Sequence, residues 1–392
     1  MNDKSNYPKV AYLLSAAEIG GTEKMFLLLG QALQAKNFRL KFFLILGKGS
    51  FSLALQEAGL DSFVVDLRKG ITHWLRLIRA LSRMRPDILH TAIFWGNIIG
   101  RLCGKILKIP VIISSQRSTD PWRKWYHWYL DRITLKWCRI IISNSYAARS
   151  ILIDKRIVPQ GGIRVIPNGI RIGKVPPWPR SVLGLKPSEM AIVTVGHLRS
   201  AKGHKYLLLA ASEVVKRYPG VKFILVGEGP LRKNIENQVE SLGLAGRVQL
   251  LGFQKNPQGI VAACDIFVLP SLWEGCPVSL LEAMSLAKPC VATAVGDVPI
   301  IIQSGHNGFL IEPGNHRQMA EVLINLLEDG KLRSKLGKVA RETICQNYSW
   351  EKMVSSYTFL YTDHLSLLSS KLAVKSEIWD EKEAQFDVSQ NG

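Results

Sequence analysis

The chain has 392 residues, which exceeds the usual size of one domain. Of these residues, 47% are hydrophobic and 21% are charged, and this composition excludes a disordered chain. Its formal net charge is +20, and residues 1–180 hold 29 Lys and Arg against 10 Asp and Glu, so an anionic partner is expected for the first half. The N-terminus is polar, which argues against a secreted protein, and the apolar runs are too short to span a bilayer. The six cysteines form no zinc-type cluster and are expected to be free thiols. Together these features predict a cytoplasmic protein.

Short runs rich in Val, Ile and Leu alternate with amphipathic stretches through residues 1–172. The expected strands lie at residues 9–15, 40–46, 62–67, 86–91, 111–116 and 139–145, and the expected helices at 22–36, 52–59, 73–85 and 97–108. This alternation predicts a parallel sheet covered by helices, and hence a first α/β domain.

A second domain is expected after a linker at residues 173–188, because residues 167–189 contain five prolines. Over residues 189–349 the alternation starts again, with strands expected at 191–196, 222–229, 248–253, 265–271, 289–296 and 308–313. Residues 371–392 are a polar, acidic tail. The predicted fold class is therefore α/β, with two doubly wound, Rossmann-like domains whose sheets face a central cleft.

The segment LWEGCPVSLLEA, residues 272–283, places Glu274 on a loop and Glu282 in the helix that follows. The N-terminus of that helix is suited to a diphosphate, and a carboxylate inside the helix can accept hydrogen bonds from a ribose. Glu274 is placed to accept hydrogen bonds from sugar hydroxyls on the other side of the phosphates. An ordinary loop–helix junction with a glutamate complementing the dipole accounts equally well for this spacing alone.

The longer run DIFVLPSLWEGCPVSLLEAMSLAKPCVATAVGDVPIII, residues 265–302, resembles the donor-site signature of the retaining glycosyltransferases of family 4, which have the GT-B fold. The resemblance extends over nearly the whole chain and is strongest at residues 190–315. It implies that Glu274 contacts the donor sugar, that Glu282 binds the ribose, and that a helix at about residues 350–370 returns to the first domain. The donor-binding residues that it implies between the two acids are Gly275, Cys276, Pro277, Val278 and Ser279.

Three further segments of the second domain fit this resemblance. In VGHLRSAKGHKYLL, Lys202 matches the family's lysine on the diphosphate, while His197 stands in place of the usual arginine and Arg199 is a candidate for the missing charge. Surface charges on a strand–helix turn are the alternative interpretation. The nucleotide-side candidates are Gly227 in LVGEGPLR and Gly252 and Phe253 in VQLLGFQ.

In the first domain, Gly20 and Gly21 follow the first strand, where glycine lets backbone N–H groups approach a phosphate or an acceptor. A plain tight turn is nearly as good an interpretation. At the end of VIISSQR, Gln116 and Arg117 stand where many relatives carry a histidine near the reacting sugar. His90 is interpreted as a hydrogen-bonded core histidine.

No D-x-D sequence occurs in the chain, so the usual carboxylate pair for a metal-bound sugar diphosphate is missing. Lysine, arginine and a helix N-terminus are expected to neutralise the departing diphosphate instead. We therefore expect no metal and no cofactor, with a nucleoside-diphosphate sugar as co-substrate. The resemblance implies retention at the anomeric carbon through front-face attack by the acceptor.

Tryptophans and basic residues gather in residues 120–139 and, upstream, in residues 73–85. The residues concerned are Trp74, Arg76, Arg79 and Arg83, and then Trp122, Arg123, Lys124, Trp125, Trp128, Arg132, Lys136, Trp137 and Arg139. An interfacial surface on an anionic membrane, a nucleic-acid surface and a solvated basic face with core tryptophans all show this composition. The membrane is our working hypothesis, and no nucleic-acid partner is expected.

Two classes of function remain open from the sequence. The first is a hexosyltransferase of bacterial cell-surface polysaccharide or glycolipid synthesis, acting on a lipid-linked or membrane-proximal acceptor at the inner face of the cytoplasmic membrane. The second is a non-catalytic basic protein that binds membrane or nucleic acid on a GT-B-like scaffold. The set of Glu274, Lys202 and Glu282 favours the enzyme.

Overall fold

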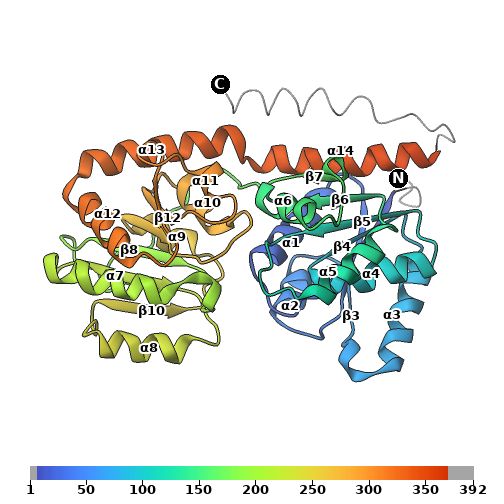
Figure 1. Ribbon diagram of the computed structural model, residues 1–392, viewed down its shortest axis with the longest axis horizontal. Coiled ribbons are helices and arrows are strands. Elements are labelled where there is room, and N and C mark those ends of the chain that lie inside the picture. The colour runs from blue at the N-terminus through green and yellow to red at the C-terminus, as the bar shows by residue number, and fades with distance from the viewer. Residues whose placement is uncertain (1–6, 370–392) are drawn as a thin grey trace.

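The computed structural model describes residues 7–369 as two α/β domains with long helices above them (Figure 1). The first domain has the strand order β3-β2-β1-β4-β5-β6-β7. Its strands are β1 (Lys9–Leu14), β2 (Arg39–Leu44), β3 (Ser62–Val64), β4 (Ile88–Ala92), β5 (Val111–Gln116), β6 (Ile140–Ser143) and β7 (Ile163–Val165). Its helices are α1 (Gly21–Gln34), α2 (Ser50–Glu57), α3 (Ile71–Met84), α4 (Phe94–Ile106), α5 (Trp125–Leu135) and α6 (Tyr146–Asp154).

The second domain has the strand order β10-β9-β8-β11-β12-β13. Its strands are β8 (Ala191–Val195), β9 (Lys222–Val226), β10 (Val248–Gly252), β11 (Ile266–Leu269), β12 (Cys290–Thr293) and β13 (Phe309–Ile311). Its helices are α7 (His204–Arg217), α8 (Arg232–Ser241), α9 (Gln258–Ala263), α10 (Val278–Ser285), α11 (Val298–Ile301), α12 (His316–Glu328) and α13 (Gly330–Asn347), and α14 (Trp350–Ser369) follows them.

Neighbouring strands pair in parallel in both sheets, which confirms the predicted fold class. Each expected strand forms. The inner strands of both sheets are buried, whereas the edge strands β3 and β10 are only partly buried. The structure adds β7, a strand of three residues that is too short to show a pattern of its own. The carboxyl ends of parallel strands lie at one edge of a sheet, and ligands of such folds bind there.

Helix α14 packs against the core of the first domain. Its Met353, Tyr357 and Tyr361 are buried in one cluster with Tyr12 of β1. The Tyr361 hydroxyl lies 2.5 Å from His90 Nδ1 and 3.1 Å from the Tyr12 hydroxyl. Burial lowers the pKa of His90 to about 3, so the ring is neutral and belongs to the core, as predicted.

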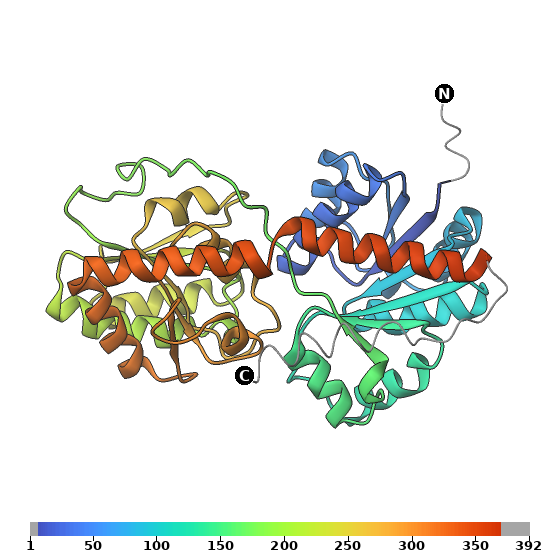
Figure 2. The same ribbon diagram turned by 90° about the horizontal axis from the view of Figure 1, so that it is seen from above.

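The chain crosses between the domains twice, and the two crossings are hydrogen-bonded to each other. Ile170 donates its N–H to the Tyr348 carbonyl at 2.8 Å and accepts from the Trp350 N–H at 3.0 Å. Figure 2 shows the linker passing the junction of α13 and α14 at this point. Gly169 leaves no room for a side chain, since a Cβ atom there would lie 2.7 Å from the Ser349 carbonyl oxygen. We call these paired crossings, which connect the two domains, the hinge.

Candidate active site

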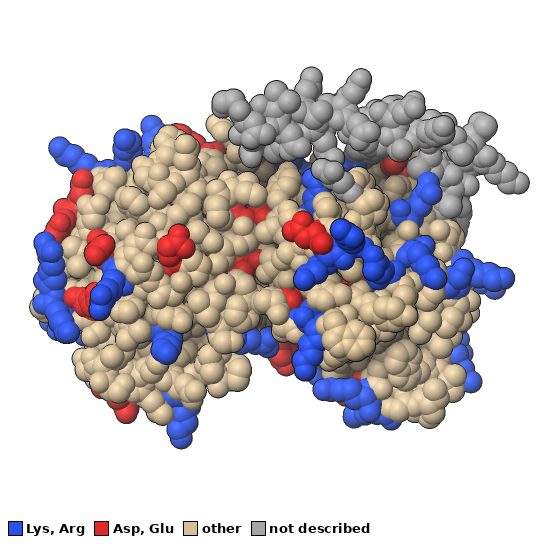
Figure 3. All heavy atoms as spheres, viewed as in Figure 1, with Lys and Arg blue, Asp and Glu red and all other residues tan. Residues whose placement is uncertain are grey.

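The candidate site lies where the carboxyl edges of the two sheets face each other. The space-filling view shows a notch between the two domains at the lower centre (Figure 3). From the second sheet, the segment after β11 carries Glu274 and leads into α10 with Glu282. From the first sheet, the loop after β1 brings Gly20, Gly21 and the start of α1 to the same region.

Glu274 is held by two residues of its own domain. Its Oε1 atom forms an ion pair with Lys202 Nζ and accepts a hydrogen bond from Ser271 Oγ at 2.7 Å. Lys202 ends a short 3₁₀ turn after β8, and the next residue, Gly203, has a φ of +60°. A Cβ atom on Gly203 would lie 1.9 Å from the Pro270 carbonyl oxygen, so only glycine lets the turn pack against the end of β11. The turn therefore holds Lys202 beside Glu274.

Glu282 is 7% exposed and lies within α10. Its Oε1 atom accepts hydrogen bonds from Lys24 Nζ at 2.7 Å and from Gln258 Nε2 at 2.9 Å. Lys24 belongs to α1 of the first domain, whereas Gln258 begins α9 of the second. The carboxylate predicted for the ribose thus bridges the domain interface. Neither partner was predicted from the sequence, since neither falls in a motif.

The loops after β8 and β9 form the side of the site nearest Gly20. His197 is half-buried, its Nδ1 atom lies 3.3 Å from the Glu228 carbonyl oxygen, and its Nε2 atom lies 3.3 Å from where a Gly20 Cβ would stand. Gly227 has a φ of +148°, and its Cβ would lie 1.9 Å from the Gly196 carbonyl oxygen, so this position requires glycine. Arg199 is exposed beside this loop, and it acts electrostatically on the buried Glu23 of α1.

The remaining nucleotide-side candidates lie at the end of β10. Gly252 has a φ of +69°, and Phe253, which follows it, is exposed. At the start of α10, Pro277 is the N-cap residue, and Val278 contacts the position of Gly21, 3.6 Å from where its Cβ would stand. Ser279 is half-buried in the first turn of the same helix. Of these residues, Val278 approaches the first domain, at Gly21.

The glycine pair brings the start of α1 close to the second domain. The Gly20 N–H donates to Glu23 Oε2 at 2.9 Å, which fixes the turn before the helix. Burial raises the pKa of the Glu23 carboxyl, and the positive charges of Arg117 and Arg199 oppose that shift. A larger residue in place of Gly20 would meet Glu23 and His197 at the same time.

Gln116 and Arg117 lie together at the end of β5, but their side chains contact different partners. Gln116 donates to Asp120 Oδ2 at 3.0 Å and accepts from Arg123 Nη2 at 2.9 Å, so it is bonded into the turn that follows β5. Arg117 donates to Asn168 Oδ1 at 2.7 Å.

Asn168 continues this chain of contacts into the second domain. Its Nδ2 atom donates to the Cys276 carbonyl oxygen at 2.7 Å, which ties the Glu274 loop to the hinge. Burial raises the pKa of the Cys276 thiol to about 12, so this cysteine contributes its backbone rather than a nucleophile. Asn168 lies in the segment VIPNGI, residues 165–170, and its role was not predicted from the sequence.

Asp297 joins the domains on the other side of the Glu274 loop. Its carboxylate accepts hydrogen bonds from the backbone N–H groups of Tyr146, at 2.9 Å, and Ala147, at 2.8 Å, at the start of α6. Its own N–H donates to the Gly275 carbonyl oxygen at 2.9 Å. Burial raises the pKa of Asp297 to about 6 although both N–H groups favour the charged form. Asp297 is also the N-cap residue of α11, and its contact with α6 was not predicted from the sequence.

The basic aromatic stretch is divided between surface and core. Trp125 is 79% exposed, and it shares one face of α5 with Tyr129, Arg132 and Lys136, all exposed and spaced three or four residues apart. We call the exposed residues Trp122, Lys124, Trp125, Tyr129, Arg132 and Lys136 the basic aromatic surface.

Arg123 is not part of this surface, contrary to the sequence-based expectation. It is buried in ion pairs with Asp120 at 2.7 Å and Asp131 at 2.6 Å, because those carboxylates compensate its charge inside the domain. Trp128 is half-buried, and its ring lies against the Arg123 guanidinium. Trp74 and Trp137 are also half-buried, whereas Arg76, Arg79, Arg83 and Arg139 are exposed.

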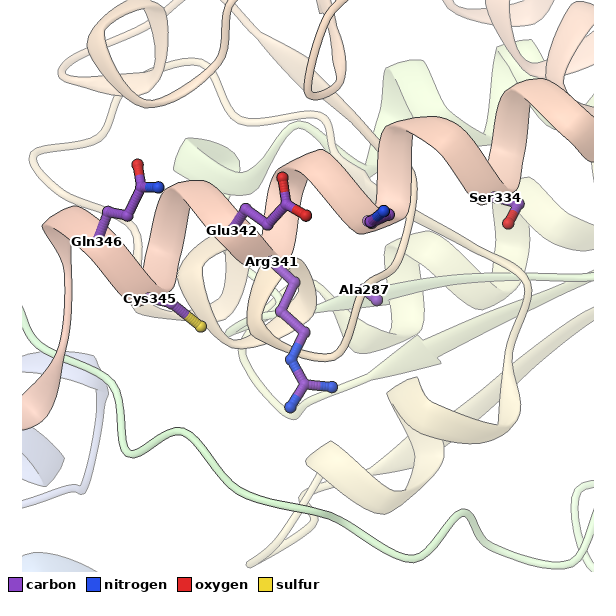
Figure 4. Close-up of a pocket in the computed structure, with 7 residues that line it drawn as sticks. Ala287, Ser334, Arg341, Glu342, Cys345 and Gln346 are labelled. Atoms are coloured by element: carbon purple, nitrogen blue, oxygen red, sulfur yellow. The ribbon is translucent and has the colours of Figure 1, made fainter.

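A hollow of about 510 Å³ lies elsewhere on the second domain, along α13 (Figure 4). It is lined by Ala287, Ser334, Lys338, Arg341, Glu342, Cys345 and Gln346. Ala287 follows the C-terminal end of α10, whereas Glu274 precedes the N-terminal end, so this hollow is not part of the candidate site. Over residues 7–369, no group of three or more His, Cys, Asp or Glu side chains is arranged to hold a metal ion, and no helix is long and apolar enough to cross a membrane.

Comparison with known proteins places this geometry in a class. Residues 180–343 match the family described as glycosyl transferases group 1, and residues 19–174 match glycosyltransferase family 4. The crystal structure of HepE from Anabaena in complex with UDP-glucose superposes with a TM-score of 0.81 at 21% identity, covering 91% of this chain and 99% of that one. The two doubly wound domains with their sheet edges opposed therefore have the GT-B fold.

The chain belongs to the group 1 glycosyltransferases, and the family resemblance seen in its sequence is confirmed. It is 27% identical over 318 residues to the UDP-Gal:alpha-D-GlcNAc-diphosphoundecaprenol alpha-1,3-galactosyltransferase of Escherichia coli, covering 76% of this chain and 81% of that protein. It is also 35% identical over 182 residues to the N-acetyl-alpha-D-glucosaminyl L-malate synthase of Bacillus anthracis, covering 46% of this chain and 48% of that protein.

The raised pKa of Asp297 predicts a pH-dependent contribution to stability. The pKa of Asp297 is raised from 3.8 to about 6 in the folded state. The stabilisation linked to this shift is fully present when the pH is below the unfolded-state pKa, and it is lost as the pH rises through the folded-state pKa. Asp297→Asn lacks this titration. We expect the free energy of unfolding of the wild type, relative to that of the variant, to fall by about 2 kcal/mol between about pH 4 and about pH 7. Urea denaturation of both proteins at both pH values measures the difference between their free energies of unfolding. If this difference stays constant or rises with pH, the pKa of Asp297 is not raised.

Proposed function

We propose that this glycosyltransferase moves a hexose from a uridine-diphosphate sugar to a lipid-linked or membrane-proximal acceptor, with retention of the anomeric configuration. The observation that carries the proposal is the pairing of Lys202 with Glu274 on the donor loop, with Glu282 inside the helix that follows. One carboxylate therefore lies before the N-terminus of α10 and the other lies within the helix, which is an arrangement that suits a nucleotide sugar.

In the proposed complex, the diphosphate lies between the N-terminus of α10 and the side chains of Lys202 and Arg199. The positive end of the helix and the two cations stabilise the negative charge that develops as the glycosidic bond to the phosphate breaks. Glu274 accepts hydrogen bonds from the hydroxyls of the donor sugar, and Glu282 accepts from the ribose. Lys202 contacts both Glu274 and the phosphate region, so it couples the position of the sugar to that of the leaving group.

Retention follows in this proposal from front-face attack. The acceptor hydroxyl approaches the anomeric carbon from the side on which the diphosphate departs, and the leaving phosphate oxygen takes its proton. The new glycosidic bond therefore forms on the face that the phosphate leaves. The chain's own contribution is to hold the donor and to exclude water from the closed cleft.

The choice of uridine and of a lipid-linked acceptor is supported by the relatives. The E. coli relative is named for UDP-Gal and a diphosphoundecaprenol acceptor, and HepE was crystallised with UDP-glucose. The basic aromatic surface on α5 supports an acceptor at an anionic membrane, and hence a location at the inner face of the cytoplasmic membrane. A non-catalytic binding protein has no need for the assembled pair of Lys202 and Glu274, so we favour the enzyme.

The first test removes the donor-sugar carboxylate. We expect Glu274→Gln to lower kcat about 100-fold or more, in the range seen when one preorganised electrostatic contact is lost, while the affinity for UDP changes little. The measurement is transfer of radiolabelled sugar from UDP-hexoses, with UDP binding followed by calorimetry. Glu240→Gln is the matched control, because Glu240 is exposed on α8 away from the cleft. Near wild-type kcat in Glu274→Gln would contradict the proposed role.

The second test concerns metal. We propose that Lys202, Arg199 and the N-terminus of α10 neutralise the diphosphate, so transfer should continue in excess EDTA at an unchanged rate. Initial rates are compared with and without the chelator, and again after adding magnesium or manganese. Loss of activity on chelation, followed by recovery with either metal, would show that a divalent cation takes part.

The third test concerns the membrane. The protein should sediment with vesicles containing phosphatidylglycerol and remain in solution with phosphatidylcholine vesicles. Replacing Lys124, Arg132 and Lys136 together by Gln should weaken binding about 100-fold, since each basic residue near the surface contributes about 1 kcal/mol. The control carries Lys216, Lys331 and Lys335 changed to Gln, which removes the same charge from exposed positions of the second domain. Equal loss in both variants, or equal binding to both vesicles, would contradict a specific surface.

A further inference from the structure

Glu282 is contacted from two directions at the same oxygen atom. Lys24 Nζ lies 2.7 Å and Gln258 Nε2 2.9 Å from its Oε1 atom. A carboxylate oxygen has two lone pairs, so two donors satisfy Oε1. Within residues 7–369, both of these donors contact Oε1, and Oε2 is left to accept hydrogen bonds from a ligand.

Gln258 and Glu282 are held in one rigid unit of the second domain. Gln258 begins α9, and Ile260 and Val261 of this helix are buried in one hydrophobic cluster with Leu281 of α10. The linker covers the start of the helix, where Gly259 leaves room for it. A Cβ on Gly259 would lie 2.6 Å from the Trp178 ring, and the backbone N–H of Trp178 donates to the Gly259 carbonyl oxygen at 3.0 Å.

Lys24 reaches Glu282 from the other domain. It lies in the first turn of α1, which approaches α10 where Gly21 contacts Val278. The Lys24 side chain is 31% exposed, so the ion pair lies at the edge of the cleft rather than inside a domain. Because the two partners belong to different domains, this contact exists only when the domains are together.

We propose that Lys24 and Gln258 are positioning residues for the ribose of the donor, an inference that rests on the proposed function. They hold Oε1 of Glu282 so that Oε2 is presented to the 2′- and 3′-hydroxyls. Gln258 does so within its own domain, whether the cleft is open or closed. Lys24 does so across the interface, so recognition of the ribose depends on closure of the two domains.

The experiment compares the dissociation constants of UDP and 2′,3′-dideoxy-UDP by calorimetry. The ratio of the two constants reports recognition of the ribose hydroxyls, and a general loss of stability does not change it. For the wild type we expect UDP to be preferred about tenfold or more, the value of a hydrogen bond to a charged acceptor. In Gln258→Leu and in Lys24→Met the preference should fall to about threefold or less on the same scale, and Lys24→Arg should restore it.

Lys255→Met is the matched control. Lys255 forms an ion pair between the domains with Glu57, at 2.6 Å, away from the pair of Lys24 and Glu282. This variant should keep the wild-type preference for UDP. A control that loses the preference as fully as Lys24→Met would overturn the specific role of Lys24, since it would show an effect of closure alone.

Two further outcomes separate the inference from the proposal on which it rests. If Glu282→Gln abolishes the preference while Lys24→Met and Gln258→Leu both keep it, the positioning role is wrong and the ribose assignment stands. If Glu282→Gln itself keeps the preference, the ribose assignment fails, and the positioning role fails with it. Urea denaturation of each variant shows whether it folds. If Gln258→Leu does not fold, Lys24→Met still tests the proposal, because the Lys24 side chain is partly exposed.

Discussion

The structure depends on how the loop that carries Glu274 is fixed between the two domains. The backbone of this loop is held on one side by Asn168, which donates to the Cys276 carbonyl, and on the other by Asp297, whose N–H donates to the Gly275 carbonyl. Gly275 allows this close approach, because a Cβ there would lie 3.2 Å from the Arg117 carbonyl oxygen. A loop held through its backbone leaves its carboxylate side chain available for substrate, so the fold and the site share one set of contacts.

Charged and polar contacts, rather than a continuous apolar core, join the domains. The buried clusters of the two domains are separate, with Val278 at the edge of both. Between them lie the pair of Lys24 and Glu282 and the capping of α6 by Asp297. Such contacts exchange readily with water and with ligand groups. An interface of this kind suits an enzyme whose domains must part to admit a donor and close again over it.

The sequence predicted the fold class and the donor loop because both depend on local patterns. Apolar runs of strand length mark the sheets, and Glu274, Lys202 and Glu282 lie in short sequence motifs, residues 195–208 and 265–302. Lys24 was not predicted, because it stands 258 positions from Glu282 and only the packing of the domains brings the two together. The burial of Arg123 was missed for a similar reason. Its partner Asp131 reads as an ordinary surface charge until α5 folds against α4 and the turn at Asp120.

The central claim is that the opposed sheet edges bind a nucleotide sugar, with its two ends on the two glutamates. A crystal structure of the protein with a non-hydrolysable UDP-hexose tests this most directly. We expect the ribose hydroxyls to contact Glu282 Oε2, the diphosphate to lie between the N-terminus of α10 and Lys202, and the sugar to lie against Glu274. A nucleotide bound outside the cleft, for example in the hollow along α13, or bound with its ribose away from Glu282, would contradict it.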